Sequence, residues 1–182
     1  HRDKRVSPVR SVLDELQAHH ADNFGWALAC CAWQPDVAED ALQEAYLRVL
    51  DGRAAFGGRS APKTWFFAVI RRVAADLHRA GKRRAILNMR VVAGDGMATG
   101  EGADVGATDA LYAEEASRQL RAALMQLSSR QREILHLVFY AEMTLEEAAA
   151  ILNISLGSTR THYHRGKERL AQLLELNYAT GP

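Results

Sequence analysis

A glycine-rich interruption between Val91 and Asp109 constrains this chain more than any other feature. Five glycines and four acidic residues lie there with almost no large apolar side chains, and neither a helical nor a strand period runs through them. Such a stretch is typical of a flexible linker. It divides the 182 residues into units of about 85 and about 70 residues, each near the lower size limit for independent folding.

Helical periodicity dominates both units, and the alternating β-branched runs of strands do not occur. We therefore predict an all-α fold of two small helical domains, residues 10–86 and 111–175, joined by a flexible, Gly-rich, acidic linker at 87–110. Apolar runs fall far short of the roughly 18 residues that span a bilayer, and no secretion signal is recognisable. The adjacent Cys30 and Cys31 are the two cysteines, which suits a reducing, cytoplasmic setting.

The segment from Pro35 to Asp51 predicts an amphipathic helix with an unusual outer face. Its buried side recurs at three-and-four spacing and comprises Ala38, Leu42, Ala45, Tyr46 and Val49. The opposite side, within about 120°, comprises Asp40, Gln43, Glu44 and Leu47. An apolar Leu47 on an outward polar face gains no stabilisation from exposure to water. We expect this face to bind a partner.

A second helix is predicted from Pro62 to Gly81, with Phe66, Val69, Ile70, Val73 and Leu77 buried. Its other side is strongly basic and includes Arg71, Arg72, Arg79 and Lys82, with Trp65 and Phe67 at the flanks. Rings beside cations suit single-stranded nucleic acid, because bases stack on the rings while cations follow the phosphates. For either ring alone, a core position is the simpler interpretation. The Gly57-Gly58 loop before this helix is a further candidate contact.

The last unit carries two capping boxes, Ser128 with Gln131 and Thr144 with Glu147. A short turn at Asn153 and Ile154 then precedes a long helix predicted over 156–174. Helix, tight turn and helix predict a helix-turn-helix. The outward side of the long helix comprises Ser158, Thr161, His162, Arg165 and Arg169, with Arg160 and Lys167 at the edges. Short polar groups and long cations suit a DNA major groove; the alternative is a helical hairpin with a charged face.

These motifs resemble those of bacterial alternative sigma factors of the extracytoplasmic-function group, the compact class with only the second and fourth sigma domains. Residues 40–47, Asp-Ala-Leu-Gln-Glu-Ala-Tyr-Leu, resemble its polymerase-binding motif, with Tyr46 in place of the usual Phe. Residues 61–66 and the basic helix resemble the −10 segment. Residues 127–133 and 151–160 resemble the −35 domain, although Thr159, Thr161 and His162 stand where Val, Ser and Arg are common.

The resemblance implies an initiation factor that binds core RNA polymerase, through its β′ clamp helices and β flap, and promoter DNA. Asp40, Gln43, Glu44 and Leu47 would bind the clamp helices. The implied −10 contacts are Trp65, Phe67, Arg71, Arg72, Arg79 and Lys82. The implied −35 contacts are Ser158, Arg160, Thr161, His162, Arg165 and Lys167. An anti-sigma factor is an expected partner, and no cofactor, metal, catalytic residue or membrane insertion is implied.

Two other functions compete with this one. An ordinary helix-turn-helix regulator would explain residues 128–175 but would leave the outer face of 35–51 without a purpose. A helical-bundle hydrolase would need metal ligands from His19, His20 and Asp22 beside the cysteines. Adjacent histidines point about 100° apart on a helix, whereas ligands need three-or-four spacing. We therefore expect surface histidines, buried thiols and no enzyme.

Overall fold

Four helices form the N-terminal half of the described chain. The structure is a computed structural model that describes residues 8–89 and 108–179. The four helices are α1 (Pro8–Ala18), α2 (His20–Cys30), α3 (Pro35–Leu50) and α4 (Pro62–Met89). Pro35 and Pro62 occupy first-turn positions, where the missing N–H costs no helical hydrogen bond. Between α2 and α3, Ala32 and Trp33 take left-handed φ angles of 52° and 60°, which reverse the chain within a few residues.

The second half contains the predicted helix-turn-helix. Its elements are α5 (Thr108–Met125), α6 (Ser129–Leu135), the π-helix η1 (His136–Tyr140), α7 (Leu145–Leu152) and α8 (Leu156–Ala179). Both predicted capping boxes are formed, at Ser128 before α6 and at Thr144 before α7. Asn153 ends α7 in the left-handed conformation that Asn tolerates, and the chain turns there into α8.

Two helices run further than the sequence predicts. We expected α4 to end at Gly81, but it continues to Met89. Gly81 does not take a positive φ, and Lys82, Arg83 and Arg84 after it are strong helix formers that carry the helix on. α8 likewise passes Leu174 and ends at Ala179. The predicted linker 87–110 overlaps α4 and α5 at its ends, and residues 90–107 of it lie outside the described residues.

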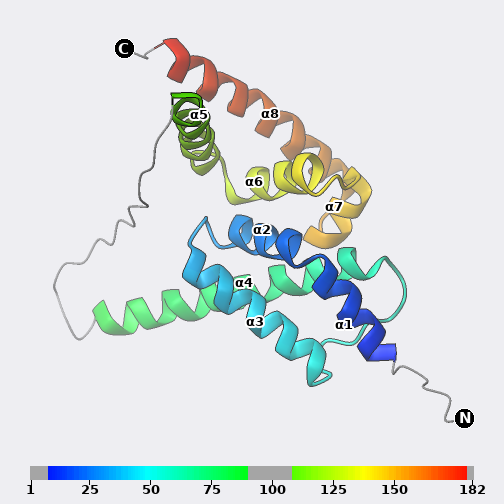
Figure 1. The fold of residues 1–182 in the computed structure, drawn as a ribbon. Coiled ribbons are helices and arrows are strands. Elements are labelled where there is room, and N and C mark those ends of the chain that lie inside the picture. The colour runs from blue at the N-terminus through cyan, green and yellow to red at the C-terminus, as the bar shows by residue number, and fades with distance from the viewer. Residues whose placement is uncertain (1–7, 90–107, 180–182) are drawn as a thin grey trace, which may run out of the picture.

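One hydrophobic core joins the two halves. Its N-terminal members include Trp26, Phe66, Phe67, Ile70 and Val73, and its C-terminal members include Ile134, Leu137, Ala148 and Ile151. In Figure 1, α6 and α7 lie directly against α2 and the first part of α4, while α3 lies on the other side of α2. A smaller cluster of Ala123, Leu127, Leu135 and Leu173 holds α5 and α8 to α6. The helices of the described ranges are all too short or too polar to cross a bilayer.

Candidate nucleic-acid and partner surfaces

The outer face of α3 is exposed as the sequence predicts. Its buried side packs on α2 and α4, so Asp40 and Gln43 face solvent. Leu47 is 52% exposed and Leu50, one turn further along, is 61% exposed. The sequence analysis missed Leu50, although its spacing of three from Leu47 places it on the same edge of the helix. α3 therefore presents a continuous apolar edge flanked by polar groups.

Glu44 is tied into a network of ion pairs at the end of α3. Its Oε1 accepts from Arg48 Nε at 2.9 Å and from Arg53 Nη1 at 3.1 Å. The hydrogen bond from Arg48, with the charge of both guanidinium groups, holds the pKa of Glu44 below its usual value. Arg53 also donates to Asp51 at 2.6 Å. Glu44 is therefore charged, and it anchors the loop that leads toward α4.

Trp65 lies in a cavity of about 360 Å³ at the start of α4. Phe56 packs against it with ring centroids 5.3 Å apart, and Trp65 remains partly exposed. Arg59 and Arg72 also line this cavity, so cations and rings meet at one place. Phe56 and Arg59 were not singled out from the sequence, although they belong to the glycine-containing loop that it marked. The far wall of the cavity comes from α7.

Phe67 does not belong to this surface. Its ring is fully buried and stacks on Trp26 with centroids 5.5 Å apart, and the Trp26 indole N–H donates to the Phe67 carbonyl at 2.9 Å. The expectation that Phe67 faces nucleic acid is therefore wrong for this structure. The physical reason is that α2 packs on this side of α4, where the Trp26 ring covers the Phe67 ring.

The remaining basic residues of α4 divide into two groups. Arg72, Arg79 and Lys82 are exposed, and Arg79 pairs with Asp76 one turn before it. The hydrogen bond from Arg79 is the main cause that lowers the pKa of Asp76. Arg71 is different, because its side chain is only 22% exposed and its Nε lies 3.4 Å from Oε2 of Glu133 on α6.

The outer side of α8 is open to solvent. Exposed residues there are Ser158, Arg160, Thr161, Arg165, Lys167 and Arg169, and His162 is half-buried. Thr159, on the opposite side, is fully buried. Three of the polar groups are already oriented within the unit. Arg160 Nη2 lies 3.8 Å from Glu146, Thr161 Oγ1 donates to the Gly157 carbonyl at 3.0 Å, and Lys167 Nζ lies 4.7 Å from the Tyr163 ring.

The histidine and cysteine group is not arranged as a metal site. Asp22 Oδ2 accepts from Lys63 at 2.7 Å, and this hydrogen bond lowers its pKa. His19 Nδ1 lies 3.7 Å from the same oxygen. Burial raises the pKa of Cys31 to about 11 and that of Cys30 well above its usual value, so both thiols are protonated at neutral pH. Within 8–89 and 108–179, no three His, Cys, Asp or Glu side chains are close enough to hold a metal ion.

A helix-turn-helix, a second surface of rings and cations and an exposed apolar edge on α3 together are typical of DNA-binding transcription factors. Residues 17–84 match the family Sigma-70 region 2, and residues 123–172 match Sigma-70, region 4. The chain is 34% identical over 143 residues to the ECF RNA polymerase sigma factor SigX of Bacillus subtilis, covering 76% of this chain and 71% of SigX. It is 32% identical over 168 residues to the RNA polymerase sigma factor CarQ of Myxococcus xanthus, covering 91% of each.

Solved structures agree at the level of the fold. The sigma factor RpoE of Bartonella quintana, in complex with the anti-sigma factor NepR, superposes with a TM-score of 0.66 at 24% identity and covers 89% of this chain and 97% of its own. CnrH, in complex with the cytosolic domain of CnrY, superposes with a TM-score of 0.57 at 19% identity and covers 92% and 89%. The chain belongs to the extracytoplasmic-function sigma factors of the sigma-70 family.

Proposed function

We propose that this sigma factor binds core RNA polymerase through α3, reads −10 and −35 promoter elements through α4 and α8, and promotes strand opening. The observation that carries the proposal is the outer face of α3, where the half-exposed Leu47 lies among Asp40, Gln43 and Glu44. A regulator that acts on duplex DNA alone has no use for such a face. RNA synthesis itself belongs to the polymerase, so this chain is not an enzyme.

The α3 face is assigned to the β′ clamp helices. Leu47 would supply apolar contact area, and the acidic groups around it would pair with cations of the clamp, which gives orientation more than affinity. Glu44 has a second role, because it holds Arg53 and with it the loop toward α4. The C-terminal unit, residues 111–175, is assigned to the β flap and the −35 element.

The cavity at Trp65 is assigned to the opened non-template strand. Trp65 and Phe56 offer rings for stacking, and Arg72 and Arg59 lie within reach of the phosphates. Extruding a base costs a few kcal/mol, and stacking on an aromatic side chain returns about 1–3 kcal/mol. Arg71, Arg79 and Lys82 would extend the cationic track along α4. Phe67 takes no part, since it belongs to the core.

The outer side of α8 is assigned to the −35 major groove. Ser158, Arg160, Thr161, His162, Arg165 and Lys167 lie over its first three turns, where a recognition helix contacts base edges and phosphates. We also infer control by an anti-sigma factor, which is supported by the complex of the related RpoE with NepR. The proposed place of action is the cytoplasm.

Binding to purified core RNA polymerase tests the proposal directly. We expect wild type to co-elute with core in size-exclusion chromatography. Asp40→Ala with Leu47→Gln should weaken that binding at least 10-fold while the helical content stays unchanged. Asp14→Ala with Glu15→Ala is the matched control, because it alters two exposed residues of α1 and removes charge away from α3. A wild-type chain that ignores core but retards duplex DNA would instead be an ordinary regulator.

A further inference from the structure

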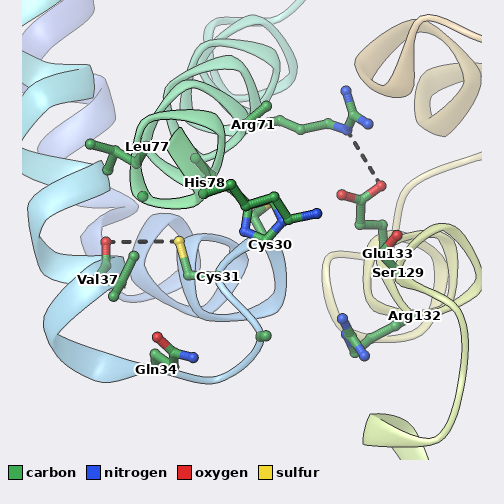
Figure 2. A pocket seen from close by; sticks show the side chains of 15 residues that line it. Cys30, Cys31, Gln34, Val37, Arg71, Leu77, His78, Ser129, Arg132 and Glu133 are labelled. Carbon is green, nitrogen blue, oxygen red and sulfur yellow. Dashed lines mark hydrogen bonds and ion pairs between the residues drawn. The ribbon is translucent and has the colours of Figure 1, made fainter. Parts of the chain in front are cut away.

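A cavity of about 590 Å³ lies where α2 and α4 approach α6 (Figure 2). Its walls are formed largely by small and apolar side chains, among them Cys30, Val37, Ala75 and Leu77. It shares no lining residue with the cavity at Trp65. Its volume lies within the roughly 300–1,000 Å³ that is usual for small-molecule sites in proteins. The cavity is therefore large enough to hold a ligand of its own.

Permanent positive charge exceeds negative charge around this cavity. Arg71, Lys82 and Arg132 line it, and Glu133 alone among the lining residues carries a carboxylate. That carboxylate is already engaged, because its Oε2 lies 3.4 Å from Arg71 Nε and 3.2 Å from Arg130 Nη1. The lining therefore lacks a negative charge that could balance the remaining cations.

Arg132 of α6 is the cation for which this lack matters most. The residue is only 9% exposed, and neither ion pair of the adjacent Glu133 involves it. Its Nη1 reaches the carbonyls of Leu124 and Leu127 at 3.4 and 3.5 Å, which is long for a hydrogen bond. Its Nε is buried without a hydrogen-bond partner among the described residues. A buried guanidinium without a counter-ion is unfavourable, so the site favours an anion.

The unpaired guanidinium and the apolar wall face the same space. In Figure 2 the Arg132 side chain extends from α6 toward the opposite wall, where Gln34 and His78 lie. Leu77 and Ala75 on α4 supply apolar surface to that wall. A molecule with a charged head and an apolar body would pair its head with the guanidinium and bury its body against α4.

We propose that this cavity binds a small amphiphilic anion, with a carboxylate head on Arg132 and an apolar body against Val37, Ala75 and Leu77. Guanidinium and carboxylate match in geometry, because two parallel N–H donors face two oxygens. One unpaired cation in a largely apolar cavity suits a singly charged carboxylate better than a doubly charged phosphate, which costs more to remove from water. This ligand site goes beyond the proposed function, since it needs neither polymerase nor DNA.

Anilinonaphthalene sulfonate is the first probe, because it joins an apolar ring system to one anionic group and fluoresces strongly once it leaves water. We expect one molecule to bind the full chain with a Kd on the order of 10 µM, which is ordinary for a ligand of this size. Decanoate should displace it. Decanol has the apolar chain without the charge, and acetate has the charge without the chain, so each should compete at least 10-fold less well.

Arg132→Met removes the charge and keeps much of the side-chain length. It should weaken the binding of both the probe and decanoate roughly 10-fold or more, the scale of a lost charge-assisted hydrogen bond. Arg118→Met is the matched control, because it changes the net charge equally at an exposed position of α5. The binding of both molecules should stay unchanged in this control.

Ala75→Phe tests the apolar wall independently of Arg132. Its ring would fill the cavity from α4, at a position exposed enough to accept a larger side chain, and should abolish decanoate binding. Ala80→Phe is the matched control, because Ala80 is exposed on the same helix and does not line the cavity. Circular dichroism of each variant ensures that only chains with wild-type helical content are compared.

Three results would overturn the proposal. Wild type might leave the fluorescence of the probe unchanged, which would show that the cavity takes no such ligand. Decanol that competes as well as decanoate would show apolar contact without recognition of an anion. Decanoate binding that is unaltered in both Arg132→Met and Ala75→Phe would place the ligand elsewhere on the molecule. Binding to core RNA polymerase enters none of these measurements, so their outcome is independent of the proposed function.

Discussion

Replacing His136 by Phe tests the burial of this imidazole between the two halves. The ring packs between Trp26 and Tyr140, and its Nε2 is buried without a hydrogen-bond partner among the described residues. Burial lowers the pKa of His136 to about 4, although the nearby Asp22 carboxylate acts in the opposite direction. In the unfolded chain the ordinary value is about 6.5. Between these two values the unfolded chain binds more protons than the folded chain.

The sign and the size of the effect follow from this difference in proton binding. Stability is fully present above about pH 6.5 and falls as the pH drops toward 4, because unfolding then takes up a proton. Between about pH 7.5 and pH 5.5 the loss is about a factor of 10 in the unfolding equilibrium, or roughly 1 to 2 kcal/mol. His136→Phe keeps a ring against Trp26 and does not titrate. It should lack this part of the pH dependence.

The assay is urea unfolding followed by circular dichroism, for wild type and His136→Phe at both pH values. Subtracting the two pH dependences cancels the contribution of every other titrating group. A difference of roughly 1 to 2 kcal/mol, with wild type the more acid-sensitive, is the expected result. If both proteins lose the same stability on acidification, His136 is not buried in its neutral form and the packing of η1 on α2 is refuted.

Three further predictions concern single side chains. Glu142 has a φ of 56°, a conformation that costs a non-glycine residue about 1 kcal/mol, so Glu142→Gly should raise the free energy of unfolding by roughly 0.5–1 kcal/mol in urea unfolding; a loss would contradict the strain. Tyr46→Phe should lower the free energy of unfolding by about 1 kcal/mol in the same assay, although Phe is usual in the family. The reason is that the Tyr46 hydroxyl accepts from Asn23 at 3.1 Å and donates to the Leu16 carbonyl at 3.3 Å. Arg165→Ala should weaken duplex −35 binding by about 1–3 kcal/mol in fluorescence anisotropy; a loss that is equal for all sequences would identify a phosphate contact.

The features that were predicted correctly from the sequence are those that depend on residues close together in the chain. The capping boxes at Ser128 and Thr144 formed as expected, because a cap depends on side chains only three residues apart. The outer face of α3 was predicted for a similar reason, since helical spacing alone separates Leu47 from the buried stripe. Family membership, the all-α fold and the presence of both domains were confirmed. The residues of the binding surfaces stay predictions.

Long-range packing could not be predicted in the same way. Phe67 lies about 100° from Phe66 around the helix. Helical spacing alone therefore places Phe67 at the edge of the buried side that contains Phe66. It is buried because Trp26 of α2, distant in sequence, stacks on the Phe67 ring and covers that side of α4. The continuation of α4 past Gly81 was missed because a glycine can end a helix or lie within one. The close approach of the Tyr140 ring to Gly25 could not be predicted either, because the two residues are far apart in the sequence.

The pairing of Arg71 with Glu133 has a consequence for how such a protein can change over evolution. One guanidinium contacts a carboxylate of its own chain and is also assigned to promoter DNA in the proposed function. A substitution at Arg71 that strengthens DNA binding therefore also alters the packing of the two halves. A substitution there that alters the packing likewise changes DNA binding. Promoter binding and the packing of the two halves therefore depend on the same codon. Selection for stronger DNA binding or for tighter packing therefore changes both properties, unless a compensating substitution at Glu133 separates them.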